Sequence, residues 1–275
     1  MMYLYSRIIC LAVICFISAS FHCIAADFKR IDNLAYKTGN GISEYEQTRC
    51  KLDLYIPSTG SSIPTLIWFH GGGLKNGDKT KKITTGLAET LAGSGVAVVA
   101  VNYRLSPTVK YPGYIEDSEA AVLWVLANIE KYGGDKGRVF VGGHSAGGYL
   151  ALMLALDARY LKNAKVAGYI PVSGHTIVHN TVRGERGLDP KQVIVDQAAP
   201  LYHANKPDVS VLIFAADNDL VSRREENTLL YSELKRSGNK HVRFVVIDDR
   251  GHNSIIAKAT SASDPLIKNI IQFMN

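Results

Sequence analysis

Apolar runs and segments of helical periodicity alternate along most of the chain. Segment 52–56 alternates apolar and polar residues and ends at Pro57, which predicts an outer strand. Continuous apolar runs predict buried strands, and apolar residues at helical spacing predict helices. The further predicted strands are residues 65–69, 96–101, 139–141, 166–172, 209–215 and 241–247. The predicted helices are residues 83–91, 117–129, 150–156, 225–237 and 265–274.

This alternation predicts an α/β fold with a mostly parallel central sheet. Strands that are apolar throughout are typical of a sheet whose two faces are both covered by helices. No internal repeat or low-complexity linker interrupts the pattern, so we expect a single domain over residues 27–275. In such sheets ligands bind at the carboxyl ends of the strands, and candidate chemistry is sought there.

The first 26 residues have the pattern of a signal peptide. Arg7 supplies a thin positive region, residues 8–16 are apolar, and Ala25 and Ala26 offer small residues for cleavage. The apolar stretch is short for a membrane-spanning helix. We therefore expect a secreted or periplasmic protein with no membrane span in its mature form, with an uncleaved anchor as the alternative.

Cysteine and charge content narrow the class of protein further. Three of the four cysteines lie in the predicted signal, which leaves only Cys50 and no internal disulfide. The remaining chain of about 250 residues can bury a core large enough to need none. The formal net charge is +6, and the densest basic cluster, around Lys79, Lys81 and Lys82, is not interleaved with aromatic residues. This pattern favours a solvated surface over nucleic-acid binding.

A candidate nucleophile lies between the strand at 139–141 and the helix at 150–156. Gly143-His144-Ser145-Ala146-Gly147 has the Gly-x-Ser-x-Gly spacing of a sharp strand-to-helix turn. Such a turn holds the serine in a strained backbone conformation, which is tolerated because its neighbours are small. We expect the hydroxyl of Ser145 to be exposed above the sheet, with the following helix pointing its N-terminus at the site.

A glycine loop follows the strand at 65–69. His70-Gly71-Gly72-Gly73 carries no side chains after His70, so it can direct two successive backbone N–H groups to one point. With the N–H of Ala146 as a third donor, this arrangement suits a tetrahedral oxyanion. The alternatives are a flexible turn or a phosphate loop, but no Walker or dinucleotide-binding spacing is present. We expect His70 to shape the loop by hydrogen bonding and not to act as a base.

A histidine and an aspartate late in the chain complete the candidate site. His252 follows the strand at 241–247 in a glycine-flanked loop, which suits a general base. Asp217 and Asp219 both follow the strand at 209–215, and one of them is expected to orient His252. The other would cap the next helix or remain in solvent.

Together these motifs resemble the esterase/lipase branch of the α/β-hydrolases, close to its carboxylesterase, feruloyl-esterase-like and kynurenine-formamidase-like groups. The resemblance covers nearly all of the chain after the signal and rests on His70–Gly73, residues 102–107 (Asn-Tyr-Arg-Leu-Ser-Pro), Gly143–Gly147, residues 217–219 and Gly251-His252. It implies an acyl-serine intermediate, with Gly72, Gly73 and Ala146 as the oxyanion hole, and neither cofactor nor metal. The chain has Leu74 where several relatives carry tryptophan, so the pocket wall differs.

The resemblance also bears on the choice between the two aspartates. In relatives the acid precedes the helix-stopping glycine by a fairly constant spacing, and counting back from Gly238 leads to Asp219. We expect the triad Ser145, Asp219 and His252, with Asp217 as the alternative acid.

Three functions remain open at this point. The first is an esterase acting on short-chain or aryl esters of small molecules, the second an amide or formamide hydrolase, and the third a binding protein on the same scaffold. Residues 174–199 lack a long amphipathic helix, so the cap is small and we expect a preference for short acyl chains. The natural ester and the oligomeric state are not fixed by the sequence.

Overall fold

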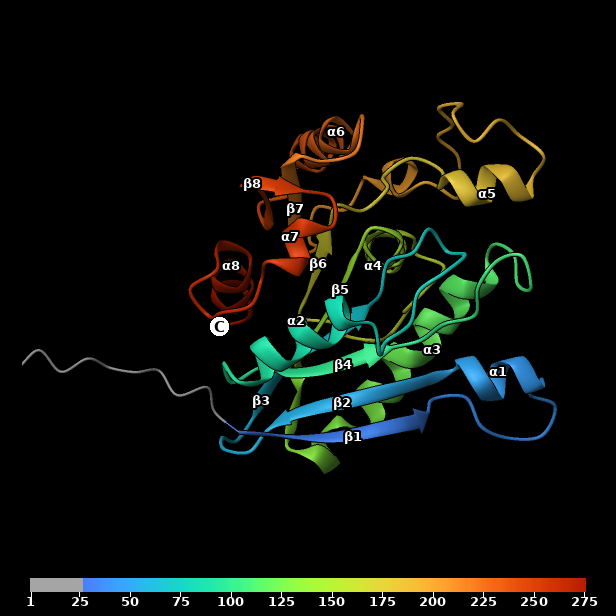
Figure 1. The fold of residues 1–275 in the computed structure, drawn as a ribbon. Coiled ribbons are helices and arrows are strands. Elements are labelled where there is room, and N and C mark those ends of the chain that lie inside the picture. The colour runs from blue at the N-terminus through green and yellow to red at the C-terminus, as the bar shows by residue number, and fades with distance from the viewer. Residues whose placement is uncertain (1–26) are drawn as a thin grey trace, which may run out of the picture.

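The computed structural model describes residues 27–275 (Figure 1). An eight-stranded sheet runs through the molecule in the order β1-β2-β4-β3-β5-β6-β7-β8. The strands are β1 (Phe28–Ala35), β2 (Lys51–Pro57), β3 (Ile63–Phe69), β4 (Ala97–Val101), β5 (Gly134–His144), β6 (Gly168–Val172), β7 (Val211–Asn218) and β8 (Val242–Gly251). Strands β3 to β8 run parallel to one another, whereas β2 pairs antiparallel with both β1 and β4. The predicted α/β fold with a mostly parallel sheet is confirmed.

Helices cover both faces of this sheet, and each face has its own apolar core. The helices are α1 (Glu44–Arg49), α2 (Lys82–Ala92), α3 (Gly113–Asn128), α4 (Ala146–Leu156), α5 (Asn180–Glu185), α6 (Arg223–Arg236), α7 (Ser254–Ala257) and α8 (Pro265–Met274), with short 3-10 helices at Ile129–Tyr132 and Pro200–His203. Helices α2, α7 and α8 pack on one face, and α3, α4 and α6 on the other. Successive residues of β3 alternate between the two cores, Leu66 and Trp68 in one and Ile67 and Phe69 in the other.

The strand predicted at 52–56 is not an outer strand. It is β2, and β1 covers its free edge. The alternation that suggested an outer strand comes from Asp53, a fully buried carboxylate 2.7 Å from the ammonium of Lys79. A strand that carries a buried, ion-paired carboxylate therefore shows the same alternation of apolar and polar residues as an edge strand facing solvent.

Several other elements differ in their boundaries from the expectation, α3 and β8 among them. Helix α3 begins at Gly113, four residues before the predicted start, so Asp117 lies inside the helix and its carboxylate is buried against Arg104. Strand β8 continues to Gly251, four residues past the predicted end, and brings the next residue, His252, directly to the carboxyl edge of the sheet.

The cap over this edge is small. Between β6 and the 3-10 helix at Pro200–His203 the only α-helix is α5, with six residues. Along the part of the chain described here, no helix is both long and apolar enough to cross a membrane. The predicted signal peptide, residues 1–26, lies outside the described residues.

Candidate active site

Ser145 occupies the turn between β5 and α4 with backbone angles φ 57° and ψ −112°. A non-glycine residue rarely adopts positive φ, so the surrounding structure must hold this conformation in place. The flanking glycines explain how strand and helix approach so closely. A Cβ at Gly147 would lie 2.0 Å from the carbonyl oxygen of Phe69, and one at Gly143 would lie 2.5 Å from the Gly147 backbone. The serine N–H donates to the Val172 carbonyl of β6 at 2.9 Å, which ties the turn to the neighbouring strand.

The structure brings His252 and Asp219 into line with this serine. The Nε2 atom of His252 lies 2.9 Å from Ser145 Oγ, and its Nδ1 atom lies 2.6 Å from Asp219 Oδ1. A carboxylate only accepts hydrogen bonds, so Nδ1 carries the proton and Nε2 is free to accept from the serine hydroxyl. The side chains of His252 and Asp219 are 13% and 1% exposed, which keeps water away from their contact.

Four donors surround the Asp219 carboxylate. Besides His252, it accepts from Ser173 Oγ at 2.5 Å, from the Leu220 N–H at 2.8 Å and from the Ala216 N–H at 3.1 Å. Burial alone would raise the pKa of Asp219, but these hydrogen bonds outweigh it and hold the pKa well below its usual range. Asp219 therefore stays ionised beside the imidazole.

Asp217 lies near the site but does not contact His252. Its carboxylate accepts the backbone N–H groups of Asp249 at 3.0 Å and Arg250 at 2.9 Å, and the bond from Arg250 is the main reason its pKa is lowered. Asp217 thus fastens the end of β7 to the segment that carries His252. It does not cap the next helix, and it remains partly exposed to solvent as expected, but its hydrogen bonds to the backbone were not predicted.

The glycine loop presents N–H groups that are not used within the protein. Gly72 and Gly73 have φ angles of 119° and 64°, and a Cβ at Gly72 would lie 2.1 Å from the carbonyl oxygen of Asn76. Within residues 27–275, the N–H groups of Gly72, Gly73 and Ala146 make no hydrogen bond. Ala146 begins α4, where backbone N–H groups are free and the helix dipole favours negative charge. These three N–H groups are therefore free to bind a ligand oxygen.

Two further histidines lie against the site without entering it. His70 donates from Nδ1 to the Gly71 carbonyl at 2.7 Å, and burial lowers the pKa of His70 to about 4. His144 donates from Nε2 to the carbonyl of His252 at 2.7 Å, and burial, then the nearby His252, lower its pKa to about 3. Both rings are therefore neutral at physiological pH and serve to hold backbone in place.

The sequence alone did not single out His144 and Ser173 as parts of this arrangement. His144 precedes the serine in the chain, and nothing else in the sequence distinguishes it. Ser173 directly follows β6, and a polar residue at the end of a buried strand beside the nucleophile is the signal that could have found it.

A pocket of about 200 Å³ opens beside Ser145, between the glycine loop and the start of α2. Its walls include Gly71, Ile83, Thr84 and Asn253. A larger hollow of about 870 Å³ is lined by α3, the start of β5 and residues 159–165, and none of Ser145, Asp219 and His252 lines it. Across the described part of the chain, no group of three or more His, Cys, Asp or Glu side chains is placed to hold a metal ion.

This sheet order, the strained serine turn and the histidine at the end of β8 define the α/β-hydrolase class of proteins. The BD-FAE family model matches residues 52–182. Esterase LipI of Mycobacterium tuberculosis (strain ATCC 25618 / H37Rv) is 39% identical over 109 residues, which are 38% of this chain and 34% of that protein. The chain thus spans about a third of the length of this and two other curated relatives that it matches.

Solved structures extend the likeness over almost the whole chain. A truncated form of a carbohydrate esterase from gut microbiota aligns with a TM-score of 0.74 and 20% identity, over 90% of this chain and 95% of that one. Carboxyl esterase 2 of the mycorrhizal fungus Tuber melanosporum aligns with a TM-score of 0.69 and 25% identity, over 91% and 86% of the two chains. The chain is thus similar to esterases in sequence over part of its length and in fold over almost all of it.

Proposed function

We propose that the protein hydrolyses carboxylic esters of small molecules through an acyl-serine intermediate on Ser145. The observation that carries this proposal is the continuous hydrogen-bonded line from Asp219 through His252 to Ser145, at 2.6 and 2.9 Å. A neutral imidazole with its Nδ1 proton on a carboxylate and its Nε2 atom on a serine hydroxyl is arranged to activate that hydroxyl.

The reaction then proceeds in two matched halves. Ser145 Oγ attacks the ester carbonyl while Nε2 of His252 takes its proton, and the carbonyl oxygen becomes an oxyanion. The free N–H groups of Gly72, Gly73 and Ala146 stabilise that charge. His252 returns the proton to the leaving alcohol as the C–O bond breaks, and Asp219 stabilises the charged ring meanwhile. Water repeats the sequence on the acyl-enzyme and releases the carboxylic acid.

The test is hydrolysis of p-nitrophenyl acetate by the wild-type protein and by Ser145→Ala, with N-formylkynurenine as a second substrate. Alanine removes the nucleophile, so we expect kcat to fall by about 10³ or more. Mass spectrometry of the wild-type protein treated with a fluorophosphonate should show one adduct, on Ser145. Full activity of S145A in a preparation free of other esterases would contradict the proposal. Faster turnover of N-formylkynurenine than of the ester would assign the site to amide hydrolysis instead.

We also propose that residues 1–26 direct export of the protein. The support is the sequence pattern alone, a positive residue followed by an apolar stretch and small residues. N-terminal sequencing of protein recovered from the medium or periplasm should begin near residue 27. Recovery of the full-length chain in the cytoplasm alone would contradict export.

A further inference from the structure

The direction of the Gly72 N–H group is set by the carbonyl that precedes it. The Gly71 C=O and the Gly72 N–H belong to one planar trans peptide unit, so they point in opposite directions. His70 Nδ1 lies 2.7 Å from that carbonyl oxygen. While this hydrogen bond is in place, the peptide cannot turn over, and the Gly72 N–H remains on the far side of the peptide from His70.

This hydrogen bond requires one particular tautomer of His70. A carbonyl oxygen only accepts, so Nδ1 must carry the proton. On the other side of the ring, Nη2 of Arg49 lies 3.3 Å from Nε2. A guanidinium only donates, so Nε2 must accept. Arg49 therefore stabilises the tautomer that can hold the Gly71 carbonyl, and disfavours the one that cannot.

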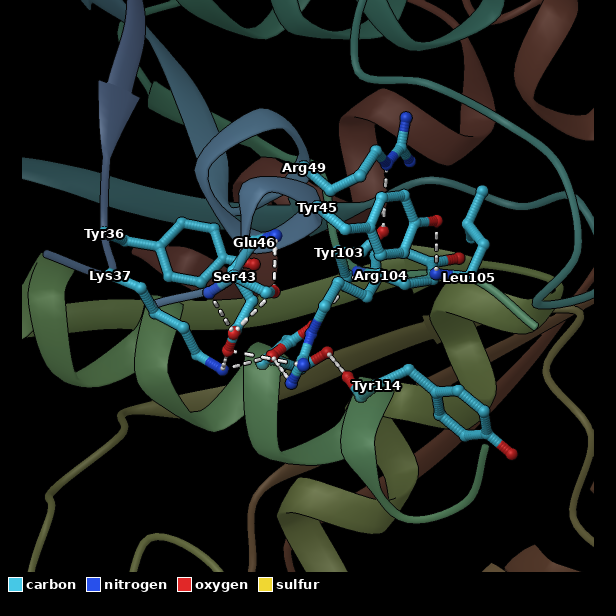
Figure 2. A network of polar contacts seen from close by, with 12 residues as sticks. Tyr36, Lys37, Ser43, Tyr45, Glu46, Arg49, Tyr103, Arg104, Leu105 and Tyr114 are labelled. Carbon is cyan, nitrogen blue, oxygen red and sulfur yellow. Dashed lines mark hydrogen bonds and ion pairs between the residues drawn. The ribbon is translucent and has the colours of Figure 1, made fainter. Parts of the chain in front are cut away.

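Arg49 is itself held by three other contacts. At the end of α1, its guanidinium donates to the Tyr103 carbonyl at 3.2 Å, to Asp78 at 2.8 Å and to the Gly77 carbonyl at 3.2 Å. Figure 2 shows the arginine extending from α1 to the backbone of Tyr103.

Tyr103 and Gly77 enclose the His70 ring from two sides. The Tyr103 ring stacks on His70 with centroids 4.5 Å apart, and its hydroxyl donates to the His70 carbonyl at 2.8 Å. A Cβ at Gly77 would lie 2.3 Å from the Gly71 oxygen and 2.4 Å from His70 Nδ1. The ring therefore has little freedom to move, and its tautomer decides whether it can donate to the Gly71 carbonyl.

We propose that Arg49 is a positioning residue for the oxyanion hole. By donating to Nε2 of His70, Arg49 keeps the proton on Nδ1, and that proton fixes the Gly71 carbonyl. The fixed carbonyl in turn directs the Gly72 N–H toward the oxyanion. This inference rests on the proposed function, because it takes Gly72 as an oxyanion donor.

The test is a double-mutant cycle between Arg49→Met and His70→Asn. The asparagine amide nitrogen takes the place of Nδ1 and carries protons in every state, so it can donate to the Gly71 carbonyl without help from Arg49. With p-nitrophenyl acetate, R49M should lower kcat about 10- to 100-fold and leave KM within about twofold, because one oxyanion donor is misdirected. In the H70N background, R49M should change kcat less than about threefold.

A second measurement needs no variant. The ¹⁵N shifts of His70 in the wild-type protein should show a protonated Nδ1 and an unprotonated Nε2 at neutral pH. A proton on Nε2 would overturn the inference, as would an equal loss of kcat from R49M in both backgrounds, or unchanged kcat with only a lower melting temperature. These outcomes are independent of the S145A result. If the role of Arg49 is contradicted, the proposed reaction on Ser145 still stands. Full activity of S145A would instead remove the basis for the role of Arg49.

Discussion

At the scale of single residues, the two neighbouring aspartates Asp217 and Asp219 have different partners. Asp219 contacts the imidazole of His252, whereas Asp217 binds backbone N–H groups of the segment that carries it. Asp219→Asn should lower kcat by about 10⁴, because an amide cannot hold the imidazole in the required tautomer or stabilise its charged form.

Asp217→Asn is the matched control for this prediction. It makes the same carboxylate-to-amide change two residues away, and its amide oxygen can still accept a backbone N–H, so kcat should fall by less than about tenfold. Parallel kinetics of the two variants on p-nitrophenyl acetate measure the difference. If D217N lost activity and D219N kept it, Asp217 would be the acid.

The candidate residues differ in how well the sequence alone could locate them. Ser145 and His70 can be identified from short contiguous motifs, because the local backbone of a serine turn or a glycine loop sets where the side chain and the N–H groups lie. The aspartate was ambiguous from the residues, since two positions in a short loop fit equally well until the path of the backbone is known. Arg49 could not be found this way, because its contact with His70 joins α1 to a loop 21 residues away.

At the scale of elements, the strongly apolar strands were located and the first strand and helix were not. β1 is mostly exposed or half-buried, and α1 has six residues with none buried, so neither has a clear apolar period. They are held by tertiary contacts instead. Lys37, just after β1, and Glu46 of α1 meet Arg104 and the buried Asp117 of α3 in one polar network (Figure 2).

The Asp117 carboxylate is the centre of this network. Its side chain is fully buried, and it accepts from Lys37, from two nitrogens of Arg104 at 2.8 Å each, and from the Arg104 N–H at 3.0 Å. Asp117→Asn removes the buried negative charge and leaves Glu46 as the one remaining carboxylate paired with Lys37 and Arg104. We expect the free energy of unfolding in urea to fall by about 3 kcal/mol or more.

Glu130→Gln gives the control for that prediction. Glu130 forms an exposed ion pair with Lys136 at 3.2 Å, with side chains 59% and 62% exposed. The same carboxylate-to-amide change there should alter the free energy of unfolding by less than about 0.5 kcal/mol. Equal losses of unfolding free energy in the two variants would mean that the Asp117 network stabilises the fold no more than an exposed ion pair does.

At the scale of the whole molecule, the small cap limits what the site can hold. Residues 174–199 contribute only α5, and the pocket beside Ser145 has a volume of about 200 Å³, below the range of drug-sized sites. We therefore expect kcat/KM for p-nitrophenyl esters to be highest at two or four acyl carbons and to fall at eight and twelve. A maximum at twelve carbons would show that the acyl chain lies elsewhere.

Buried neutral histidines make the stability of the whole fold depend on pH. Burial lowers the pKa of His70 to about 4 and that of His144 to about 3, and it also lowers those of His175 and His179. In the unfolded chain histidine titrates near pH 6.5. Between about pH 6.5 and 4 the unfolded state therefore binds more protons, so stability is full above this window and is lost as the pH falls through it. Glu226, whose pKa burial raises, acts in the opposite direction, but it is one group against four.

The free energy of unfolding in urea should therefore be lower at pH 5 than at pH 7, with His70 and His144 each contributing on the order of 2 kcal/mol. His144→Gln tests the assignment, because the glutamine amide nitrogen can still donate to the His252 carbonyl but does not titrate. The drop between pH 7 and pH 5 should shrink in H144Q by about the share of one histidine. A drop of the same size in H144Q and wild type would mean that this ring is already protonated, or exposed to water, in the folded protein at pH 5.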